Sequence, residues 1–262
     1  MNFTQIALTA QPEKIVRLNL LDWCINKNEL LPESAWWWIA YIVGVLACIV
    51  VPYLLGSINP AILISRRMFN ADIRDHGSGN AGSTNMLRTY GKKAAGLTFA
   101  CDFLKAILAC LWGLAVWEMN GLALAGFFVI FGHMYPIFEK FRGGKGVACL
   151  AAVVLFTSVF TNNFLALPFV PFAFIFLAMI FIIVIIGTQY VSMASVTGAF
   201  MYPVILHSFS DPEQAGLCVA MAALSACFVI YKHKENLKRI YNRTESKLNL
   251  KKKSTGNKGD QK

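Results

Sequence analysis

Seven apolar runs alternate with short polar segments along the chain. A helix that crosses the hydrocarbon core of a bilayer needs about 20 mostly apolar residues, with a range of about 17–25. The runs cover residues 36–55, 94–117, 121–138, 147–160, 164–187, 190–207 and 215–231. The pattern therefore predicts an all-α integral membrane protein with about seven transmembrane helices. Because Pro168 and Pro171 lie near the start of the fifth run, we expect its helix to begin at these prolines.

The composition favours the same class. Hydrophobic residues make up 56% of the 262 residues and charged residues only 15%, whereas soluble domains carry about 25% charged residues. A water-soluble fold of this length would expose much of that apolar surface. The seven cysteines lack paired or metal-ligand spacing. We therefore interpret them as small apolar packing residues.

The net charge of +10 lies in the gaps between the apolar runs. Segments 56–93, 139–146 and the tail from residue 232 hold 20 of the 24 Lys and Arg residues. Seven spans put all three segments on one side, and cytoplasmic loops carry an excess of Lys and Arg. We therefore predict an outside N-terminus, a cytoplasmic C-terminus and no nucleic-acid partner.

The chain divides into three predicted parts. Residues 1–35 form an N-terminal extracytoplasmic or interfacial segment, in which residues 13–31 make either an interfacial helix or a disordered leader. Residues 36–248 form the seven-span domain that carries the candidate chemistry. Residues 249–262 form a basic cytoplasmic tail beside anionic lipid.

The first polar loop contains the sequence Gly-Ser-Gly-Asn-Ala-Gly-Ser-Thr-Asn at residues 77–85. Glycine permits positive φ and close approach of a ligand, and a turn rich in backbone N–H groups beside fixed cations binds anions. Ser78, Asn80 and Asn85 supply polar groups, and Arg88 follows. We interpret the loop as a phosphate site, and the alternative is a flexible linker.

Asp102 and Lys105 lie three residues apart on one face of the second run. A charged side chain at the centre of a bilayer costs about 2.5–3.5 kcal/mol on insertion scales. Two interpretations stay open. The residues form a structural ion pair, or Lys105 points into a polar cavity and holds a second anionic group.

A Gly-Gly-Lys-Gly turn at residues 143–146 leads directly into the run 147–160. Free N–H groups at a helix start, the positive end of the helix dipole and a lysine together favour an anion. The turn is not a nucleotide P-loop, because Glu139 and Gly146 replace residues that the P-loop pattern requires. The alternative is a tight structural turn.

Two further polar groups lie beside these loops. His133 is at the inner end of the third run, where a lone histidine is more typical of packing, but the 143–146 turn follows on the same side. After the last run come His233 and Asn236 at helical spacing, and then Glu245. A basic helix bound to lipid headgroups explains the lysines here but not these three side chains together.

Three segments carry a family resemblance: GSGNAGSTNMLRTYGKKAAGLTFACDFLKA, GHMYPIFEKFRGGKGVA and HKENLKRIYNRTE. Together they resemble the membrane family of acyl-phosphate:glycerol-3-phosphate acyltransferases, over about residues 40–248. The resemblance implies seven spans, an outside N-terminus and three cytoplasmic motifs, which agrees with the charge count.

The resemblance also implies roles for individual residues, with the 143–146 turn binding the phosphate of glycerol-3-phosphate. The catalytic candidates are Ser78, Arg88, His133, Asn236 and Glu245. The substrate-binding candidates are Asn80, Asn85, Lys105, Gly143, Gly144, Lys145, Gly146 and His233. The sequence departs from the family pattern at Asn59-Pro60, at Cys149 and at Arg243, which stands where glycine is usual.

The implied reaction is acyl transfer from acyl phosphate to glycerol-3-phosphate, giving 1-acylglycerol-3-phosphate and phosphate. We expect no cofactor, no metal and a monomer in membrane lipid. We expect Ser78 to donate a hydrogen bond rather than to act as a nucleophile. The base stays open among His133, His233, Glu245 and the substrate phosphate. The alternative functions are a transporter of an organic phosphate and a lipid-binding scaffold.

Overall fold

The computed structural model describes residues 19–27, 34–161 and 171–248, and every regular element in these residues is helical. In chain order the elements are α2 (Leu20–Lys27), α3 (Ala35–Ser57), α4 (Pro60–Phe69), η2 (Ile73–Asp75), α5 (Ser83–Met134), η3 (Ile137–Glu139), α6 (Val147–Phe160), α7 (Phe172–Thr188), α8 (Val191–Phe209), α9 (Pro212–Lys232) and α10 (Lys234–Tyr241). The prediction of an all-α protein is confirmed.

The second and third apolar runs are the two arms of α5. The helix is interrupted at Gly91, before the first arm, and again at Trp117 and Glu118 between the two arms, because the backbone angles of these residues are not helical. The arms fold back on each other, because the backbones of Gly113 and Gly121 are in direct contact. Small residues allow helices to approach closely in this way in membrane proteins. Helix α5 therefore contains two apolar arms that lie side by side.

The remaining runs also form helices. The fourth to seventh runs correspond to α6, α7, α8 and α9. Helix α7 begins at Phe172, directly after Pro171, as the prolines predicted. The earlier part of that run, with Pro168, lies outside the described residues. The Asn59-Pro60 departure is a helix start, because Asn59 Oδ1 accepts the Ile62 N–H and Pro60 occupies the first turn of α4.

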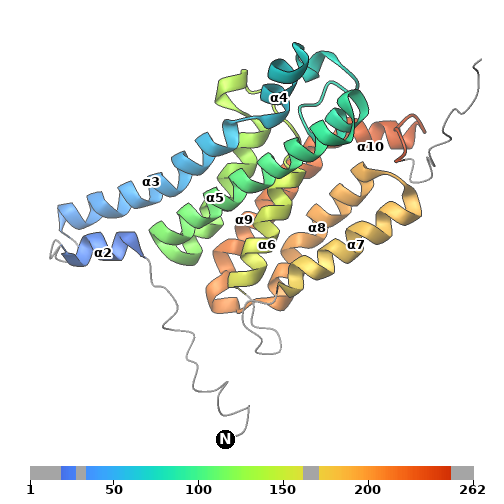
Figure 1. The fold of residues 1–262 in the computed structure, drawn as a ribbon. Helices are drawn as coiled ribbons and strands as arrows, with labels where there is room; N and C mark the ends of the chain where they lie inside the picture. Colours follow the sequence, from blue (N-terminus) through green and yellow to red (C-terminus); the bar gives the residue numbers. More distant parts are fainter. Residues whose placement is uncertain (1–18, 28–33, 162–170, 249–262) are drawn as a thin grey trace, which may run out of the picture.

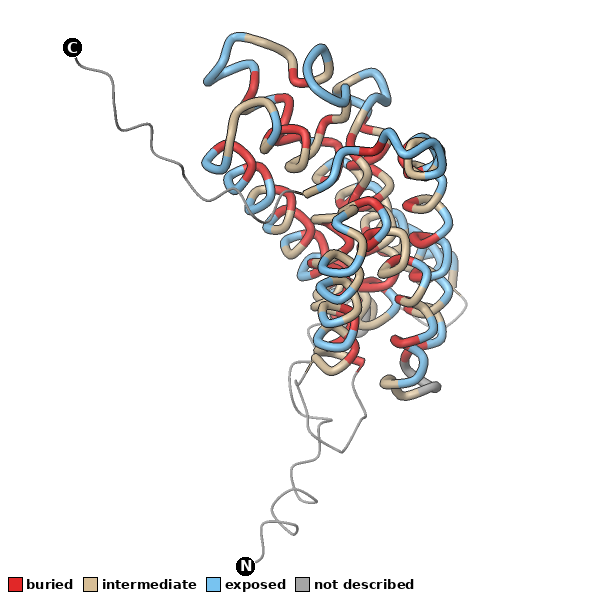
Figure 2. The backbone as a smooth tube through the Cα atoms, turned by 90° about the vertical axis from the view of Figure 1, so that its right-hand side faces the viewer, coloured by how far each residue is buried: buried red, intermediate tan, exposed pale blue. Residues whose placement is uncertain are grey.

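The surface of the helices is apolar. Large side chains such as Ile183, Ile186 and Phe200 are 68%, 66% and 61% exposed, while the buried core includes many alanines and three cysteines, Cys110, Cys149 and Cys218. Buried and exposed positions alternate along the helices (Figure 2). By length and composition, three helical stretches of the described chain suit a membrane crossing: Ala35–Phe69, Ser83–Glu139 and Ala215–Lys232. Two more apolar helices, Val147–Phe160 and Phe172–Thr188, are shorter.

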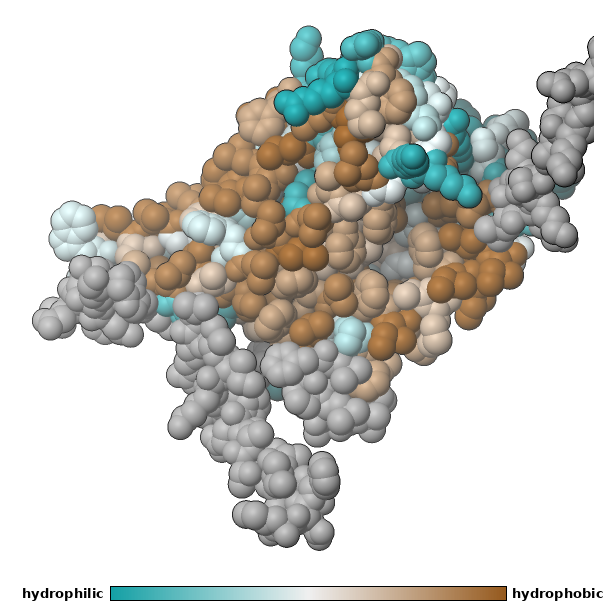
Figure 3. Space-filling view, viewed as in Figure 1, coloured by the Kyte–Doolittle hydropathy of each residue, from teal (hydrophilic) through white to brown (hydrophobic). Residues whose placement is uncertain are grey.

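The polar residues gather at one end of the bundle. Helix α4, the loops around it and α10 lie at this end, and α2 lies at the other (Figure 1). In the same view hydrophilic side chains cover the end with α4, while hydrophobic ones cover most of the rest (Figure 3). At the far end α2 packs on α3 through Leu21, which lies against Gly44. Residues 13–31 therefore include a helix, and their other described residue is Asn19.

Candidate active site

Three polar segments, distant in sequence, meet at the polar end. The first loop precedes α5, the 143–146 turn precedes α6, and residues 233–245 follow α9. The Ala81 carbonyl of the first loop lies against Gly144. The Lys145 ammonium donates a hydrogen bond to Oδ1 of Asn236. All three segments therefore contribute to one site.

Asn85 shapes the first loop from inside. Its Oδ1 accepts the N–H of Ser78 at 2.9 Å, and its Nδ2 donates to the carbonyls of Ile73 at 3.1 Å and His76 at 2.9 Å. The amide is buried, and its oxygen and nitrogen are both engaged. Asn85 therefore positions the loop, while the Ser78 side chain stands on its exposed surface.

The start of α5 leaves anion-binding groups available. Its N-cap is Gly82, so no side chain caps the first backbone N–H groups of the helix. Arg88 is exposed on the same helix, and no carboxylate of the described residues pairs with it. A free helix start beside an unneutralised guanidinium suits a phosphate.

A cluster of ion pairs fixes the first loop against the second. Arg66 pairs with Asp72 at 2.9 Å and with Glu139 at 3.0 Å. Arg74 pairs with Asp72 at 2.7 Å and with Glu139 at 3.2 Å. The hydrogen bond from Arg74 holds the pKa of Asp72 well below its usual range. Several charges in a network hold geometry better than one surface pair.

Gly144 lies at the seam of the two loops. Its N–H donates to the His133 carbonyl at 3.1 Å. A Cβ at this position would overlap His133 Nε2 and would lie 2.6 Å from the Ala81 oxygen. Only glycine fits there without displacing a neighbour. Gly146, at φ +77°, then caps the start of α6 without a side chain, as an anion-binding helix start requires.

Lys145 is a partly buried cation between the motifs. Burial is the largest cause that lowers its pKa, to about 8. The nearby charge of Glu245 opposes this shift, and the positive charges of Arg239, Arg88 and Lys232 add to it. The hydrogen bond to Asn236, and the contact of the neighbouring Gly144 with the Ala81 carbonyl, place Lys145 where the three polar segments meet.

A buried network holds the last segment. Asn236 Nδ2 donates to Ser192 Oγ at 2.9 Å and to Glu245 Oε1 at 2.7 Å. Ser192 Oγ donates to Glu245 Oε1 at 2.6 Å, and Arg239 Nε donates to Oε2 at 2.7 Å. Burial alone would raise the pKa of Glu245, but these hydrogen bonds outweigh it and lower the pKa. Ser192 could not be identified from the sequence, because it is one serine at the start of an apolar run.

His233 has a structural position beside this network. It precedes the first residue of α10, and its buried Nδ1 lies 2.7 Å from the Val229 carbonyl, so Nδ1–H donates to that oxygen. Burial lowers its pKa to about 4, against the opposing effect of this hydrogen bond. The imidazole is therefore neutral at pH 7.

Asp102, Lys105 and His133 form a buried cluster beneath the loops. Lys105 Nζ lies 2.8 Å from Asp102 Oδ1, 3.0 Å from the Gly56 oxygen and 2.6 Å from the Ile58 oxygen. An ammonium has three hydrogens, and these acceptors use all three. The cluster therefore has the geometry of the structural ion pair, and Lys105 keeps no hydrogen for a substrate phosphate.

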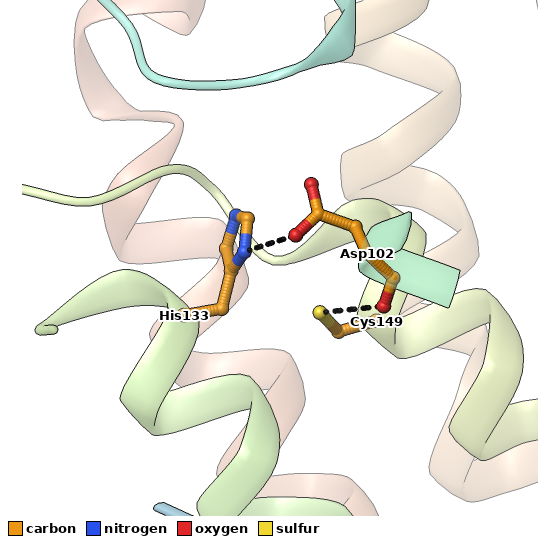
Figure 4. A group of neighbouring side chains, drawn as sticks. All are labelled: Asp102, His133 and Cys149. Atoms are coloured by element: carbon orange, nitrogen blue, oxygen red, sulfur yellow. Dashed lines mark hydrogen bonds and ion pairs between the residues drawn. The ribbon is translucent and has the colours of Figure 1, made fainter. Parts of the chain in front are cut away.

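The same count fixes the tautomer of His133. Its Nδ1 lies 3.0 Å from Asp102 Oδ1 (Figure 4). Because the hydrogens of Lys105 are used elsewhere, Nδ1 carries the proton and donates it to Asp102. Nε2 then faces Gly144 as an acceptor. An Asp–His pair of this kind can orient a general base.

Asp102, His133 and Cys149 bring three potential metal-ligand atoms within 4.8 Å of one another. The Lys105 ammonium already lies 2.8 Å from Asp102 Oδ1 and 3.1 Å from His133 Nδ1. Cys149 Sγ instead donates to the Asp102 backbone carbonyl at 3.4 Å. The residues present fit a buried ammonium better than a divalent ion, because two cations at that place would repel each other.

An all-helical bundle with an apolar surface and a cationic polar site at one end defines an integral membrane protein. The family model described as glycerol-3-phosphate acyltransferase matches residues 46–243. The chain belongs to this family.

Curated relatives cover most of the chain. A glycerol-3-phosphate acyltransferase of Clostridioides difficile (strain 630) is 40% identical over 210 residues, which are 78% of this chain and 95% of the relative. One of Bacillus subtilis (strain 168) is 38% identical over 201 residues, covering 76% of this chain and 95% of the relative.

A solved structure is also similar: PlsY (YgiH), an integral membrane glycerol 3-phosphate acyltransferase, in its glycerol 3-phosphate form. It has a TM-score of 0.68 and 30% identity, covering 79% of this chain and 96% of that chain. Its lysophosphatidic acid form has a TM-score of 0.66 and 29% identity, covering 79% and 95%.

Proposed function

We propose that this chain transfers a fatty acyl group from acyl phosphate to the 1-hydroxyl of glycerol-3-phosphate, the first acylation of phospholipid synthesis. The observation that carries the proposal is the contact between Lys145 and Asn236, which joins the second and third motifs. Family membership supports the acceptor substrate. We also propose that the enzyme works as a monomer in membrane lipid.

In the proposed reaction the glycerol hydroxyl oxygen attacks the acyl carbonyl carbon. The bond from that carbon to the phosphate oxygen breaks, and inorganic phosphate leaves with the hydroxyl proton. An acyl phosphate carries its own leaving group, so the protein positions two anionic substrates and stabilises the oxyanion. Arg88 and Lys145 bind phosphoryl groups, and the 143–146 turn and Asn80 line the site. Ser78 donates a hydrogen bond to the reacting carbonyl or phosphate.

The geometry argues against two of the four candidates for the general base that accepts the hydroxyl proton. Glu245 accepts three hydrogen bonds, and His233 has a pKa of about 4, so neither suits proton transfer at pH 7. His133 and the substrate phosphate remain. His133→Gln separates them: a loss in kcat of about 10²–10⁴ assigns the base to His133, and retained kcat assigns it to the phosphate.

Purified protein in lipid, given palmitoyl phosphate and glycerol-3-phosphate, tests the function. Release of phosphate together with 1-acylglycerol-3-phosphate supports the enzyme. Uptake of glycerol-3-phosphate into vesicles without lipid product would instead indicate a transporter, and unchanged rates in Arg88→Ala would indicate a scaffold. Mass spectrometry of donor-treated protein tests Ser78, because an acylated Ser78 peptide would contradict direct attack.

We also propose seven spans in the bacterial inner membrane, with the N-terminus outside and the site on the cytoplasmic face. The gathering of basic segments at one end of the bundle supports this orientation. Cysteine labelling in a cysteine-free background tests it. Cysteines placed at Asn80, Lys140 and Lys238 should react from the cytoplasmic side only, and reaction of any one from the outside would contradict the proposal.

A further inference from the structure

A polar pocket of about 770 Å³ lies beside the candidate active site. Gly79 of the first loop, Gly143 of the glycine turn and Lys232 at the end of α9 all line it. The pocket therefore opens between the same segments that form the site. Neither the sequence motifs nor the proposed reaction has assigned Lys232 a role.

Some of the positive charges that line this pocket are neutralised by carboxylates and others are not. Arg66 and Arg74 line it, but both are paired with Asp72 and Glu139. Lys140, Arg142 and Lys232 also line the pocket, and none of the three forms an ion pair with a carboxylate of the described chain. Lys140 and Arg142 are exposed, whereas Lys232 is half-buried, so solvent screens the charge of Lys232 least and leaves it available to an anionic ligand.

The aromatic ring of Tyr135 holds Lys232 in place. The Lys232 ammonium lies 4.3 Å from the ring centroid, within the range of a cation–π interaction. The backbone carbonyl of Tyr135 accepts the Tyr53 hydroxyl at 2.9 Å, which ties this residue to α3. The ring orients the cation without neutralising it, since an aromatic face carries no net charge.

The proposed reaction brings two anionic substrates together and therefore needs several cations at the site. Two phosphoryl groups approach each other, and Lys105 has no hydrogen left for either of them. Lys145 is held by Asn236 in the polar network of α10, which suits the wholly polar glycerol-3-phosphate. The pocket of Lys232 differs, because Phe138 and Phe141 also line it and are 62% and 56% exposed. A cation beside exposed aromatic side chains suits an amphiphile with a phosphoryl head.

We propose that Lys232 binds the phosphoryl group of the acyl phosphate donor, with Phe138 and Phe141 beside the first part of its acyl chain. This inference rests on the proposed function. The two substrates then have separate lysines, Lys145 for glycerol-3-phosphate and Lys232 for the donor, and Arg88 is a further cation of the same site.

Steady-state kinetics of Lys232→Gln in proteoliposomes tests the assignment. The KM for palmitoyl phosphate should rise by about tenfold or more, as expected for loss of a charge-assisted contact, while the KM for glycerol-3-phosphate stays within about twofold of wild type. Lys232→Arg should restore most of the donor KM. Lys234→Gln is the matched control, because Lys234 also lies over a tyrosine, at 4.7 Å from the Tyr231 ring, but does not line the pocket.

Three results for Lys232→Gln would overturn the assignment. The first is a rise in the KM for glycerol-3-phosphate instead of the donor, and the second is no change in either KM. The third is weaker inhibition by lysophosphatidic acid with an unchanged donor KM, which would assign the pocket to the product. Binding of a non-reactive palmitoyl phosphonate, measured without glycerol-3-phosphate, decides the matter independently of turnover. If the wild-type protein binds the phosphonate but forms no lipid product, the proposed reaction is refuted. The pocket assignment is then tested separately, by whether Lys232→Gln binds the phosphonate more weakly than wild type.

Discussion

The ammonium of Lys145 donates to Oδ1 of Asn236, across 91 residues of sequence. The amide cannot turn round, because its Nδ2 donates to Ser192 and to Glu245, and an ionised carboxylate only accepts hydrogen bonds. The carboxylate itself pairs with Arg239. Lys145 is therefore positioned by a neutral oxygen and keeps its positive charge for a phosphate.

The pH dependence of glycerol-3-phosphate use should follow Lys145. Its pKa is lowered to about 8, so the side chain is charged below that pH and loses its proton above it. We expect kcat/KM for glycerol-3-phosphate at pH 9 to be about tenfold below its value at pH 7, because kcat/KM reports the free enzyme. The measurement is initial rate against glycerol-3-phosphate from pH 6.5 to 9.5.

Lys145→Arg is the control for this profile. Arginine stays protonated throughout this range, so the variant should lose the decline above pH 8 even if its activity is lower. An identical decline in the variant would mean that another group titrates.

Lys105 should matter for stability more than for phosphate binding. Lys105→Met leaves the buried Asp102 carboxylate unpaired, and breaking a buried pair costs about 3–5 kcal/mol. The double variant Asp102→Asn/Lys105→Met should be less destabilised than Lys105→Met alone. Thermal unfolding in detergent measures this difference. If Lys105 instead bound substrate, the single variant would unfold like wild type and show only a raised KM.

Gly144→Ala should reduce activity by about 10² or more, because displacements of about 1 Å at a site have this effect. The added methyl group overlaps His133 Nε2 and meets the Ala81 carbonyl, so it must push the two loops apart. Gly198→Ala in α8 is the matched control, since nothing lies within 4 Å of its Cβ position. Acyltransferase rates compare the two; equal rates would show that the loops can separate without loss.

Arg243→Gly should stabilise the protein. Arg243 has φ +59°, a left-handed conformation that costs an L-residue about 1–2 kcal/mol. This explains why glycine is usual at that position in the family pattern. We expect a gain of about 1 kcal/mol and a midpoint of thermal unfolding a few degrees higher. Arg243→Ala removes the charge but keeps Cβ, so a similar gain in that variant would contradict the backbone explanation.

The sequence predicted the helices well because helix formation in a membrane depends on local composition. A run of apolar residues must satisfy its own backbone hydrogen bonds in lipid, so its length and position mark the helix. Even the start of α7 could be predicted from Pro171. The chain turn at Trp117 and Glu118 separates two arms that the sequence had already divided into two runs.

Residue types and order alone identified the glycine turns and the motif residues Ser78, Arg88, Lys145 and Asn236, because anion-binding turns have a recognisable local composition. Packing between distant segments determined which lysine is neutralised by a carboxylate and which keeps its charge for a substrate. In the sequence, Lys105 is a lysine within an apolar run and Lys232 is a lysine just after one, and nothing there distinguishes their partners. In the structure, the Lys105 ammonium contacts a carboxylate and two carbonyls, while the Lys232 ammonium contacts an aromatic ring. A side chain's charge belongs to the sequence, whereas the groups that neutralise it depend on which helices pack together.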